Sequence, residues 1–169
     1  GQFINSLSIP NKTNYLQEIH TRNTFAATYE YTIHPSQKLV AISLLFADVL
    51  AIIDNQGEIK CQIQGPDRIN DNKIEKRMDK KSTYRTQKSD QDYIYLLYSG
   101  RKKFKNIKGQ PVPLFGKYLH IFDWKGHPVA RIQFPNETSS FVLDRETNRI
   151  ITFSPELCDI VYYNFPLDK

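Results

Sequence analysis

A short basic run in the second half of the sequence contains an aromatic ring. Residues 101–108 read Arg-Lys-Lys-Phe-Lys-Asn-Ile-Lys. Lysine and arginine side chains attract anionic groups, and a phenylalanine among them offers a flat face for stacking. We therefore predict a contact surface for an anionic ligand at Arg101, Lys102, Lys103 and Phe104. Nucleic-acid readers usually carry a denser basic face or a recognisable module, so we do not expect nucleic acid as the partner.

Three other residues are candidates for ligand contact because of their places in the predicted strands and turns. Tyr84 and Arg85 lie within Ser82–Gln87, a short predicted strand that follows a long polar stretch. Trp124 stands in the turn of a predicted hairpin. Two interpretations of Trp124 stay open. Its ring is either an exposed platform for a ligand, or it packs over the neighbouring unit of the fold, which is the commoner role of a turn tryptophan.

Recognisable catalytic and cofactor motifs are absent from the sequence. The four histidines are scattered, and no cysteine–histidine cluster has the spacing of metal ligands. There is no nucleophile elbow, phosphate loop or dinucleotide fingerprint. A glycosidase needs two carboxylates facing each other across a pocket, whereas pairs such as Asp90 and Asp92 lie at predicted loop–strand edges. We expect no metal and no cofactor, and we favour a non-enzymatic function while leaving the enzyme question open.

The elements that position these residues are predicted from a repeated hairpin pattern. Residues 50–60 and 119–129 each contain an apolar run, then Asp, two turn residues and Gly, then an alternating strand. Glycine there supplies a positive φ, and the aspartate hydrogen-bonds turn amides. Residues 33–39 and 143–150 share a second pattern of strand, polar turn, basic residue and strand. Repeated hairpins indicate repeated sheets rather than a single irregular core.

Composition and spacing predict one all-β chain with several sheets. The 169 residues include ten tyrosines and ten phenylalanines, which favour pleated sheet over helix. Antiparallel meanders are expected over residues 24–64 and 80–134, and a unit with only three strands over residues 139–167. Residues 1–23 hold a separate strand, Phe3–Ile9, and a linker. We expect strands to dominate and helical turns to be rare.

Two polar stretches, residues 65–90 and 101–117, interrupt the strand pattern. Gly65–Gln91 carries eight Lys or Arg and five Asp or Glu residues. A long loop on a rigid sheet is a common place for recognition residues, and a solvated insertion is the other interpretation. We expect Gly65–Asp90 and Arg101–Gly116 to be the most mobile parts of the chain, since they lack the apolar alternation that anchors a strand.

Charge and cysteine content give less information about the partners and location of the protein. The net charge of +5 fits an acidic partner such as an anionic glycan, and equally a surface with charged loops. Cys61 and Cys158 both fall in strand-like contexts. We expect both to be reduced and mostly buried, in different units and too far apart to bridge. No apolar run approaches the roughly 20 residues of a membrane span.

Three groups of residues together resemble the TolB-like six-bladed β-propeller proteins of Bacteroidetes cell envelopes. They are residues 93–101, residues 119–129 and residues 139–144, the last followed by a terminal strand at 160–164. Where that family typically shows a phrase of the form vFDwdGnPv, this chain has Ile-Phe-Asp-Trp-Lys-Gly-His-Pro-Val. The resemblance implies β-propeller blades of antiparallel four-stranded meanders, with about three blades of a six-bladed propeller and the look of its C-terminal half.

The resemblance also implies a function and a location. It predicts a binding or scaffolding module of the bacterial periplasm or cell surface that contacts a protein or glycan through blade-end loops. The alternative is a hydrolase or lyase that acts on a glycan in the propeller channel, where the innermost strands would offer Tyr29, Tyr31, Tyr84 and Arg85. Because Gly1 opens the chain in place of a methionine, we expect that an export signal has been removed.

An arc of about three blades predicts an assembly. Such an arc leaves apolar blade faces and unpaired strand edges in water. We expect two copies related by a two-fold axis to close a six-bladed ring, with each Phe3–Ile9 strand completing the last blade of the other copy.

Overall fold

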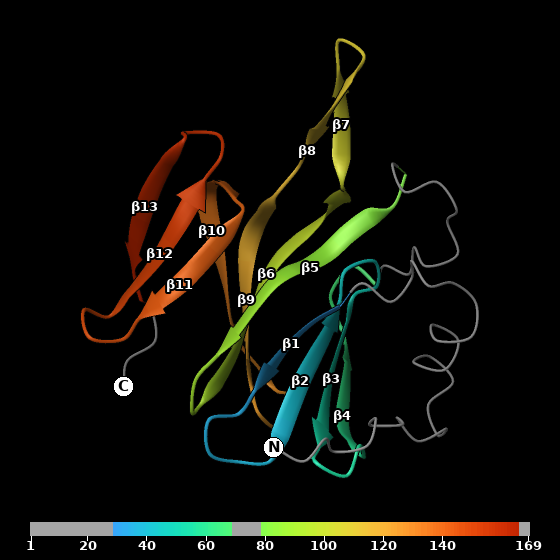
Figure 1. The fold of residues 1–169 in the computed structure, drawn as a ribbon, viewed down its shortest axis with the longest axis vertical. Helices are drawn as coiled ribbons and strands as arrows, with labels where there is room; N and C mark the ends of the chain where they lie inside the picture. Colours follow the sequence, from blue (N-terminus) through green and yellow to red (C-terminus); the bar gives the residue numbers. More distant parts are fainter. Residues whose placement is uncertain (1–28, 69–78, 166–169) are drawn as a thin grey trace, which may run out of the picture.

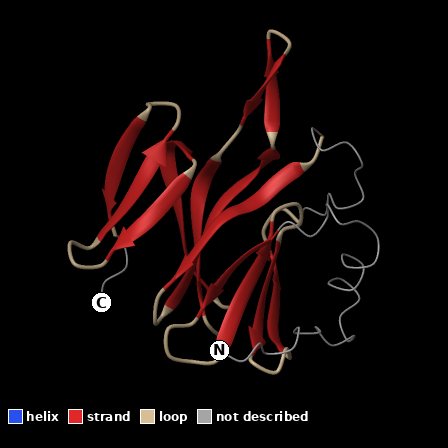
Figure 2. Ribbon diagram, in the orientation of Figure 1, coloured by secondary structure: helices blue, strands red, loops and turns tan. Residues whose placement is uncertain are grey.

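A computed structural model describes residues 29–68 and 79–165, which form antiparallel strands joined by turns (Figure 2). The strands are β1 (Tyr29–Ile33), β2 (Leu39–Leu44), β3 (Val49–Asp54), β4 (Ile59–Gln64), β5 (Lys81–Ser89), β6 (Tyr93–Lys102), β7 (Phe104–Ile107), β8 (Gln110–Pro113), β9 (Gly116–Asp123), β10 (Pro128–Thr138), β11 (Ser140–Asp144), β12 (Arg149–Ser154) and β13 (Asp159–Asn164). Helix is absent from the described ranges, which confirms the all-β prediction. The predicted strand Phe3–Ile9 lies outside the described residues.

The strands form three sheets and one ribbon (Figure 1). The first sheet has the order β1-β2-β3-β4, the second β10-β9-β6-β5 and the third β11-β12-β13. The first two therefore have the four-stranded antiparallel arrangement that the sequence predicted. The ribbon β7-β8 is inserted between β6 and β9 and projects beyond the sheets (Figure 1). β5, at one edge of the second sheet, contacts both β1 and β11 and so lies on the inner side of the arc.

The repeated Asp-x-x-Gly pattern forms the same turn twice. Asp54 Oδ1 accepts the backbone amides of residues 56 and 58, both at 2.9 Å. Asp123 Oδ1 accepts those of residues 125 and 127, at 2.9 and 2.8 Å. Gly57 and Gly126 have φ values of 83° and 90°, a region that glycine enters without strain. The two hairpins that the sequence predicted thus share one hydrogen-bonding scheme.

Alternation along the strands builds two separate cores, one in each interface between neighbouring sheets. Face-to-face packing of the first and second sheets buries Ala41, Leu50, Ile52, Tyr84, Ile94, Leu96, Tyr98, Phe122 and Trp124. Packing of the second and third sheets buries Tyr95, Leu97, Leu119, Ile121, Phe134, Phe141, Ile150 and Phe165. Consecutive β6 residues therefore serve opposite cores, as expected for a strand covered on both faces.

Several details differ from the sequence predictions. The stretch 101–117, expected as a loop, holds the end of β6, the ribbon β7-β8 and the start of β9. A ribbon with no buried face shows no apolar alternation, so the pattern did not reveal it. β10 runs on to Thr138, beyond the predicted limit of that unit. Both cysteines are free as expected, but Cys158 is exposed because it occupies the turn between β12 and β13.

Candidate functional site

Two arginines of the second sheet hold the base of the β7-β8 ribbon. Arg85 on β5 donates from Nη1 to the carbonyl oxygen of Leu114 at 2.6 Å, and its guanidinium lies 5.0 Å from the ring centre of Phe115. Arg101 on β6 donates from Nη2 to the carbonyl oxygen of Phe115 at 2.7 Å and pairs with Glu137 Oε1 at 2.9 Å. These two predicted ligand residues are therefore engaged by the backbone at the foot of the ribbon, and they position it.

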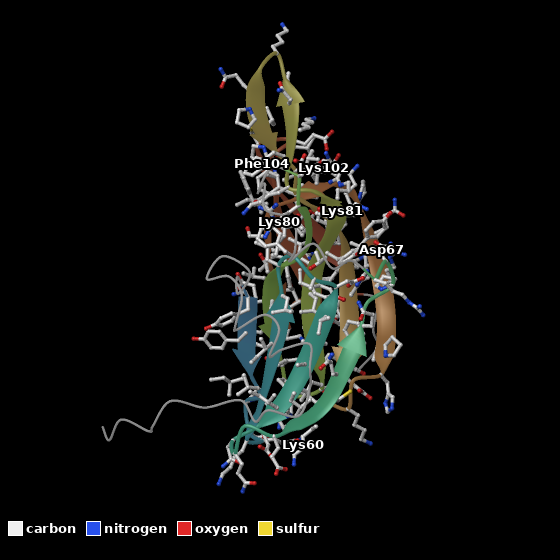
Figure 3. All side chains as sticks on the ribbon, turned by 90° about the vertical axis from the view of Figure 1, so that its right-hand side faces the viewer. Lys60, Asp67, Lys80, Lys81, Lys102 and Phe104 are labelled. Atoms are coloured by element: carbon white, nitrogen blue, oxygen red, sulfur yellow. The ribbon has the colours of Figure 1, made fainter. Side chains whose placement is uncertain are left out.

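The other basic candidates lie where β6 gives way to the ribbon (Figure 3). Lys102 is exposed at the end of β6. The Nζ atom of Lys103 lies 5.8 Å from the ring centre of Phe104 and 5.6 Å from that of Phe46. Lys80 approaches the same Phe46 ring, at 5.0 Å. Cations held over aromatic rings keep their charge while their stems cover apolar surface.

The exposed residues of this region form one continuous surface. We call residues 102–108 the hairpin surface, since they run from the end of β6 along β7 to the tip of the ribbon. Lys105 and Lys108 are exposed there, and Ile107 is 43% exposed. Lys102 pairs with Asp79 at 3.3 Å, and both side chains are more than half exposed. An ion pair this exposed to water contributes little stability, so the positive charge of Lys102 stays available to a partner.

Tyr84 belongs to a different group, a buried polar cluster between the first and second sheets. β5 is irregular on both sides of Tyr84, and its side chain lies fully buried in the interface instead of facing the inner side of the arc. Its ring lies 5.4 Å from that of Tyr98, and His120 stacks on Tyr98 at 4.5 Å. The Tyr98 hydroxyl donates to Asp67 and lies 3.4 Å from Asp48 Oδ2.

Burial sets the ionisation of this cluster. It raises the pKa of Asp48, whose Oδ1 has no hydrogen-bond partner among the described residues. It lowers the pKa of His120 to about 4, so the imidazole is neutral at neutral pH. The His120 Nε2 atom also lacks a partner within the described part of the chain. Burial, reinforced by the neighbouring carboxylates, raises the pKa of Tyr84 and Tyr98, which keep their protons.

The turn after β4 positions the acid of this cluster. The amide of Gly65 donates to the carbonyl oxygen of Asp48 at 2.7 Å, and the amide of Asp67 donates to Asp48 Oδ2 at 2.9 Å. A Cβ atom on Gly65 would lie 1.7 Å from Asp48 Oδ1. Only glycine therefore leaves room for the buried carboxylate.

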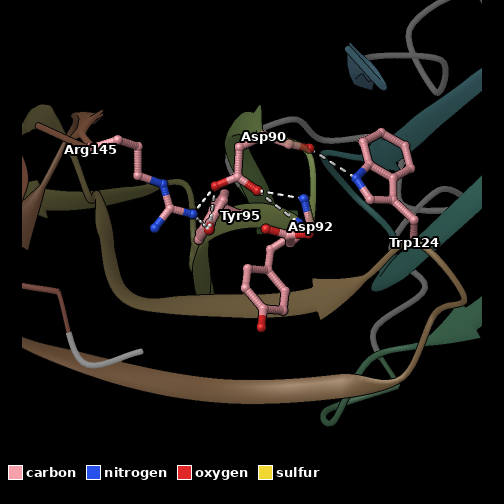
Figure 4. A network of polar contacts seen from close by, with 6 residues as sticks. Asp90, Asp92, Tyr95, Trp124 and Arg145 are labelled. Atoms are coloured by element: carbon pink, nitrogen blue, oxygen red, sulfur yellow. Dashed lines mark hydrogen bonds and ion pairs between the residues drawn. The ribbon is translucent and has the colours of Figure 1, made fainter. Parts of the chain in front are cut away.

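Trp124 joins a third group, centred on Asp90 (Figure 4). The Asp90 side chain accepts the hydroxyl of Tyr95 at 2.8 Å and pairs with Arg145 of the β11–β12 turn. Trp124 Nε1 donates to the carbonyl oxygen of Asp90 at 3.0 Å, and its ring lies 4.7 Å from that of His34. With 9% of its surface exposed, Trp124 packs between sheets, as in the second of its two interpretations. The network ties together turns from all three sheets.

Sequence reasoning did not identify three members of the buried cluster. Asp48 and His120 each interrupt an apolar run, which is the only sequence signal that a polar side chain is taken into a core. Asp67 lies in a polar stretch and carries no such signal. In residues 29–68 and 79–165, no group of three or more His, Cys, Asp or Glu side chains is arranged to hold a metal ion.

One family model matches most of the chain. Residues 1–146 match the family model described as TolB-like 6-blade propeller-like. The search of curated proteins gives no match. Among solved structures, Hsv2 of Kluyveromyces lactis aligns with a TM-score of 0.44 and 14% identity, over 80% of this chain and 32% of that chain. The WD40 domain of SCAP from fission yeast aligns with a TM-score of 0.31 and 12% identity, over 82% of this chain and 42% of that chain.

Proposed function

The chain belongs to the TolB-like 6-blade propeller-like family, and we propose that it is a non-enzymatic protein-binding module that contacts an acidic partner through the hairpin surface. Propellers are rigid stacks of sheets, and their binding residues sit on the turns and insertions at sheet ends. In this chain the largest insertion at a described sheet end is the β7-β8 ribbon (Figure 1).

The anchoring of the ribbon is the observation that carries the proposal. A two-stranded hairpin is marginally stable in water on its own. Here Arg85, Arg101 and Glu137 all bind the backbone at its foot. Three partly buried charged side chains thus hold out an element that adds nothing to either core. Such an arrangement is expected where the projecting element has a binding role.

The chemistry of the hairpin surface favours an acidic polypeptide as the partner. Its exposed lysines attract negative charge and would speed association. Ile107 offers an apolar contact, and each ribbon strand pairs on one side only, which leaves backbone groups for an added strand. A glycan would use the charge but neither of the other two features, so we favour a protein.

We place this module in the bacterial cell envelope, in the periplasm or at the cell surface, as suits a TolB-like chain. We also propose that the protein comes from a member of the Bacteroidetes. Among the described residues, none belongs to a helix long and apolar enough to cross a membrane.

We also propose that a second copy of the chain covers the two end faces of the arc. On the first sheet, Tyr29, Tyr31 and Ile33 point away from the second sheet and are more than half exposed. On the third sheet, Ile160 and Tyr162 are exposed on the face opposite its core. Both faces are apolar, and both sheets already use their other face to pack on the second sheet. Two copies that join these faces would form a closed six-bladed ring.

Calorimetric titration with an oligoglutamate peptide tests the binding function. We expect Lys102→Gln combined with Lys105→Gln to weaken binding by about tenfold at low salt, since both charges lie in the proposed contact. Lys38→Gln combined with Lys125→Gln removes two exposed lysines at the other end of the sheets and should leave the affinity unchanged. Equal loss of affinity in both double variants would show that peptide binding depends on net charge alone and not on the hairpin surface.

A glycan panel and a hydrolase substrate panel separate the alternatives. Tight binding of an acidic oligosaccharide without binding of the peptide would replace a protein partner with a glycan. Turnover of a glycan that is lost in Arg85→Gln would replace the binding function with the propeller hydrolase or lyase.

A further inference from the structure

A cleft opens on the outer side of the molecule between the first two sheets. It has a volume of about 430 Å³ and lies between β4 of the first sheet and β9 and β10 of the second. Asp67, labelled in Figure 3, lies in the turn that follows β4 at one end of the cleft. Its walls are mostly apolar, and the lining side chains include Ile63, Phe122, Pro128, Val129 and Ala130.

Two polar side chains line this cleft as neighbours. His120 on β9 and Arg131 on β10 are directly paired in the sheet register, so they project from the same face at adjacent positions. His120 is 5% exposed, and its Nε2 atom has no partner among the described residues. A buried imidazole nitrogen without a partner is uncommon, and a ligand that supplies one would relieve its desolvation.

Arg131 is held flat at the rim of the cleft. Its guanidinium lies 3.9 Å from the ring centre of Tyr118, and none of the ion pairs among the described residues includes Arg131. A planar guanidinium on an aromatic face is preorganised for bidentate contact with a carboxylate. The positive charge of Arg131 also contributes to the lowered pKa of His120, which fits the closeness of the two groups.

We propose that the cleft binds a small organic acid with an apolar body. The carboxylate would pair with Arg131 and accept a hydrogen bond from His120, and the apolar body would lie against Ile63, Phe122 and Val129. The volume is in the range of small-molecule sites, which are apolar with a few convergent polar groups. This site is separate from the hairpin surface and does not depend on the proposed function.

The probe for this site is 3-phenylpropionate, with 3-phenylpropanamide as its uncharged analogue, titrated into isotope-labelled full chain and followed by NMR. The resonances of His120, Phe122 and Val129 should shift with the acid. The amide should bind about tenfold more weakly, because it cannot form the charge-assisted pair with Arg131. Arg131→Gln should bring the acid down to the affinity of the amide.

Matched variants separate the site from general effects. Arg149→Gln removes a second arginine that lies over a tyrosine, 4.7 Å from Tyr162 on the third sheet, and should leave binding unchanged. Val129→Glu places a negative charge on the cleft wall from a position 39% exposed, so the fold should tolerate it while binding is lost. Equal binding of acid and amide, equal effects of Arg131→Gln and Arg149→Gln, or no shift in cleft resonances at millimolar probe would each overturn the proposal.

Discussion

Arg101 and Glu137 form an ion pair of 2.9 Å that holds both backbone groups of Phe115. The Phe115 carbonyl accepts a hydrogen bond from Arg101 Nη2 at 2.7 Å, and the Phe115 amide donates to Glu137 Oε2 at 2.9 Å. Phe115 lies between the ribbon and β9, where the chain leaves the hairpin and rejoins the second sheet. The pair therefore determines how firmly the ribbon is attached.

Glu137→Ala tests this attachment. The variant removes the acceptor of the Phe115 amide and the partner of Arg101, so we expect a loss of about 1–2 kcal/mol in the free energy of unfolding. Amide exchange at residues 104–113 should become faster, while Tyr93–Tyr98 stays protected. Lys102→Gln breaks the exposed pair with Asp79 and serves as the control, with no such change. Unchanged ribbon exchange in Glu137→Ala would contradict the role of the pair.

His120 should make stability depend on pH on the acidic side of neutrality. Its pKa is about 4 in the fold against an ordinary value of 6.5. Because the fold disfavours protonation, the stabilisation is fully present above pH 6.5 and is lost as the pH falls toward 4. We expect a loss of about 2 kcal/mol between about pH 7.5 and about pH 5.

Urea denaturation of wild type and His120→Phe at the two pH values measures this loss. The variant keeps a ring against Tyr98 and should lack the pH-dependent part. His127→Phe, at an exposed histidine of the β9–β10 turn, should keep it. Parallel behaviour of wild type and His120→Phe would show that another group titrates.

Gly65 and Asp48 should be energetically coupled. A Cβ atom at position 65 meets Asp48 Oδ1 at 1.7 Å, so Gly65→Ala should cost about 2–4 kcal/mol. In an Asp48→Ala background the same change should cost at least about 1 kcal/mol less, because the clashing atoms are gone. Gly109→Ala is the control: its Cβ atom meets nothing within 4 Å, so only the positive φ of 83° destabilises this variant. Strict additivity of the two changes would contradict the contact.

Light scattering at micromolar concentration tests the proposed second copy. Two chains that close a ring should scatter with the mass of a dimer. The interface between them should bury more than roughly 2,000 Å² in total. Tyr31→Glu and Tyr162→Glu each place a charge on one end face and should favour the monomer. A monodisperse monomer of the 19.8 kDa chain at all concentrations would rule the dimer out.

The parts of the fold that sequence could predict are those determined by local chemistry. Asp54 and Asp123 each precede a glycine at a fixed spacing, and each forms the expected turn. Apolar alternation located the sheets, because each buries at least one face. The ribbon was missed for the opposite reason, since it buries neither face and leaves Ile107 exposed.

The candidate sites depended on contacts between distant residues, and sequence predicted them unevenly. The basic run includes the exposed residues Lys102, Lys105 and Lys108, but nothing local shows that Arg101 is held by Phe115 and Glu137. An irregularity in β5 directs the Tyr84 side chain into the core between the first and second sheets. Strand periodicity does not predict where such a bulge occurs. His120 meets Tyr98 only because two strands pair in one register.

Chemical-shift mapping with the oligoglutamate peptide tests the central claim most directly, because it locates the contact without assuming which residues form it. The account predicts that the largest shifts in the labelled full chain fall on residues 102–108, grow with peptide concentration and diminish with added salt. Shifts centred on the β1–β2 and β9–β10 turns, or no shifts at low salt, would contradict a binding function for the hairpin surface.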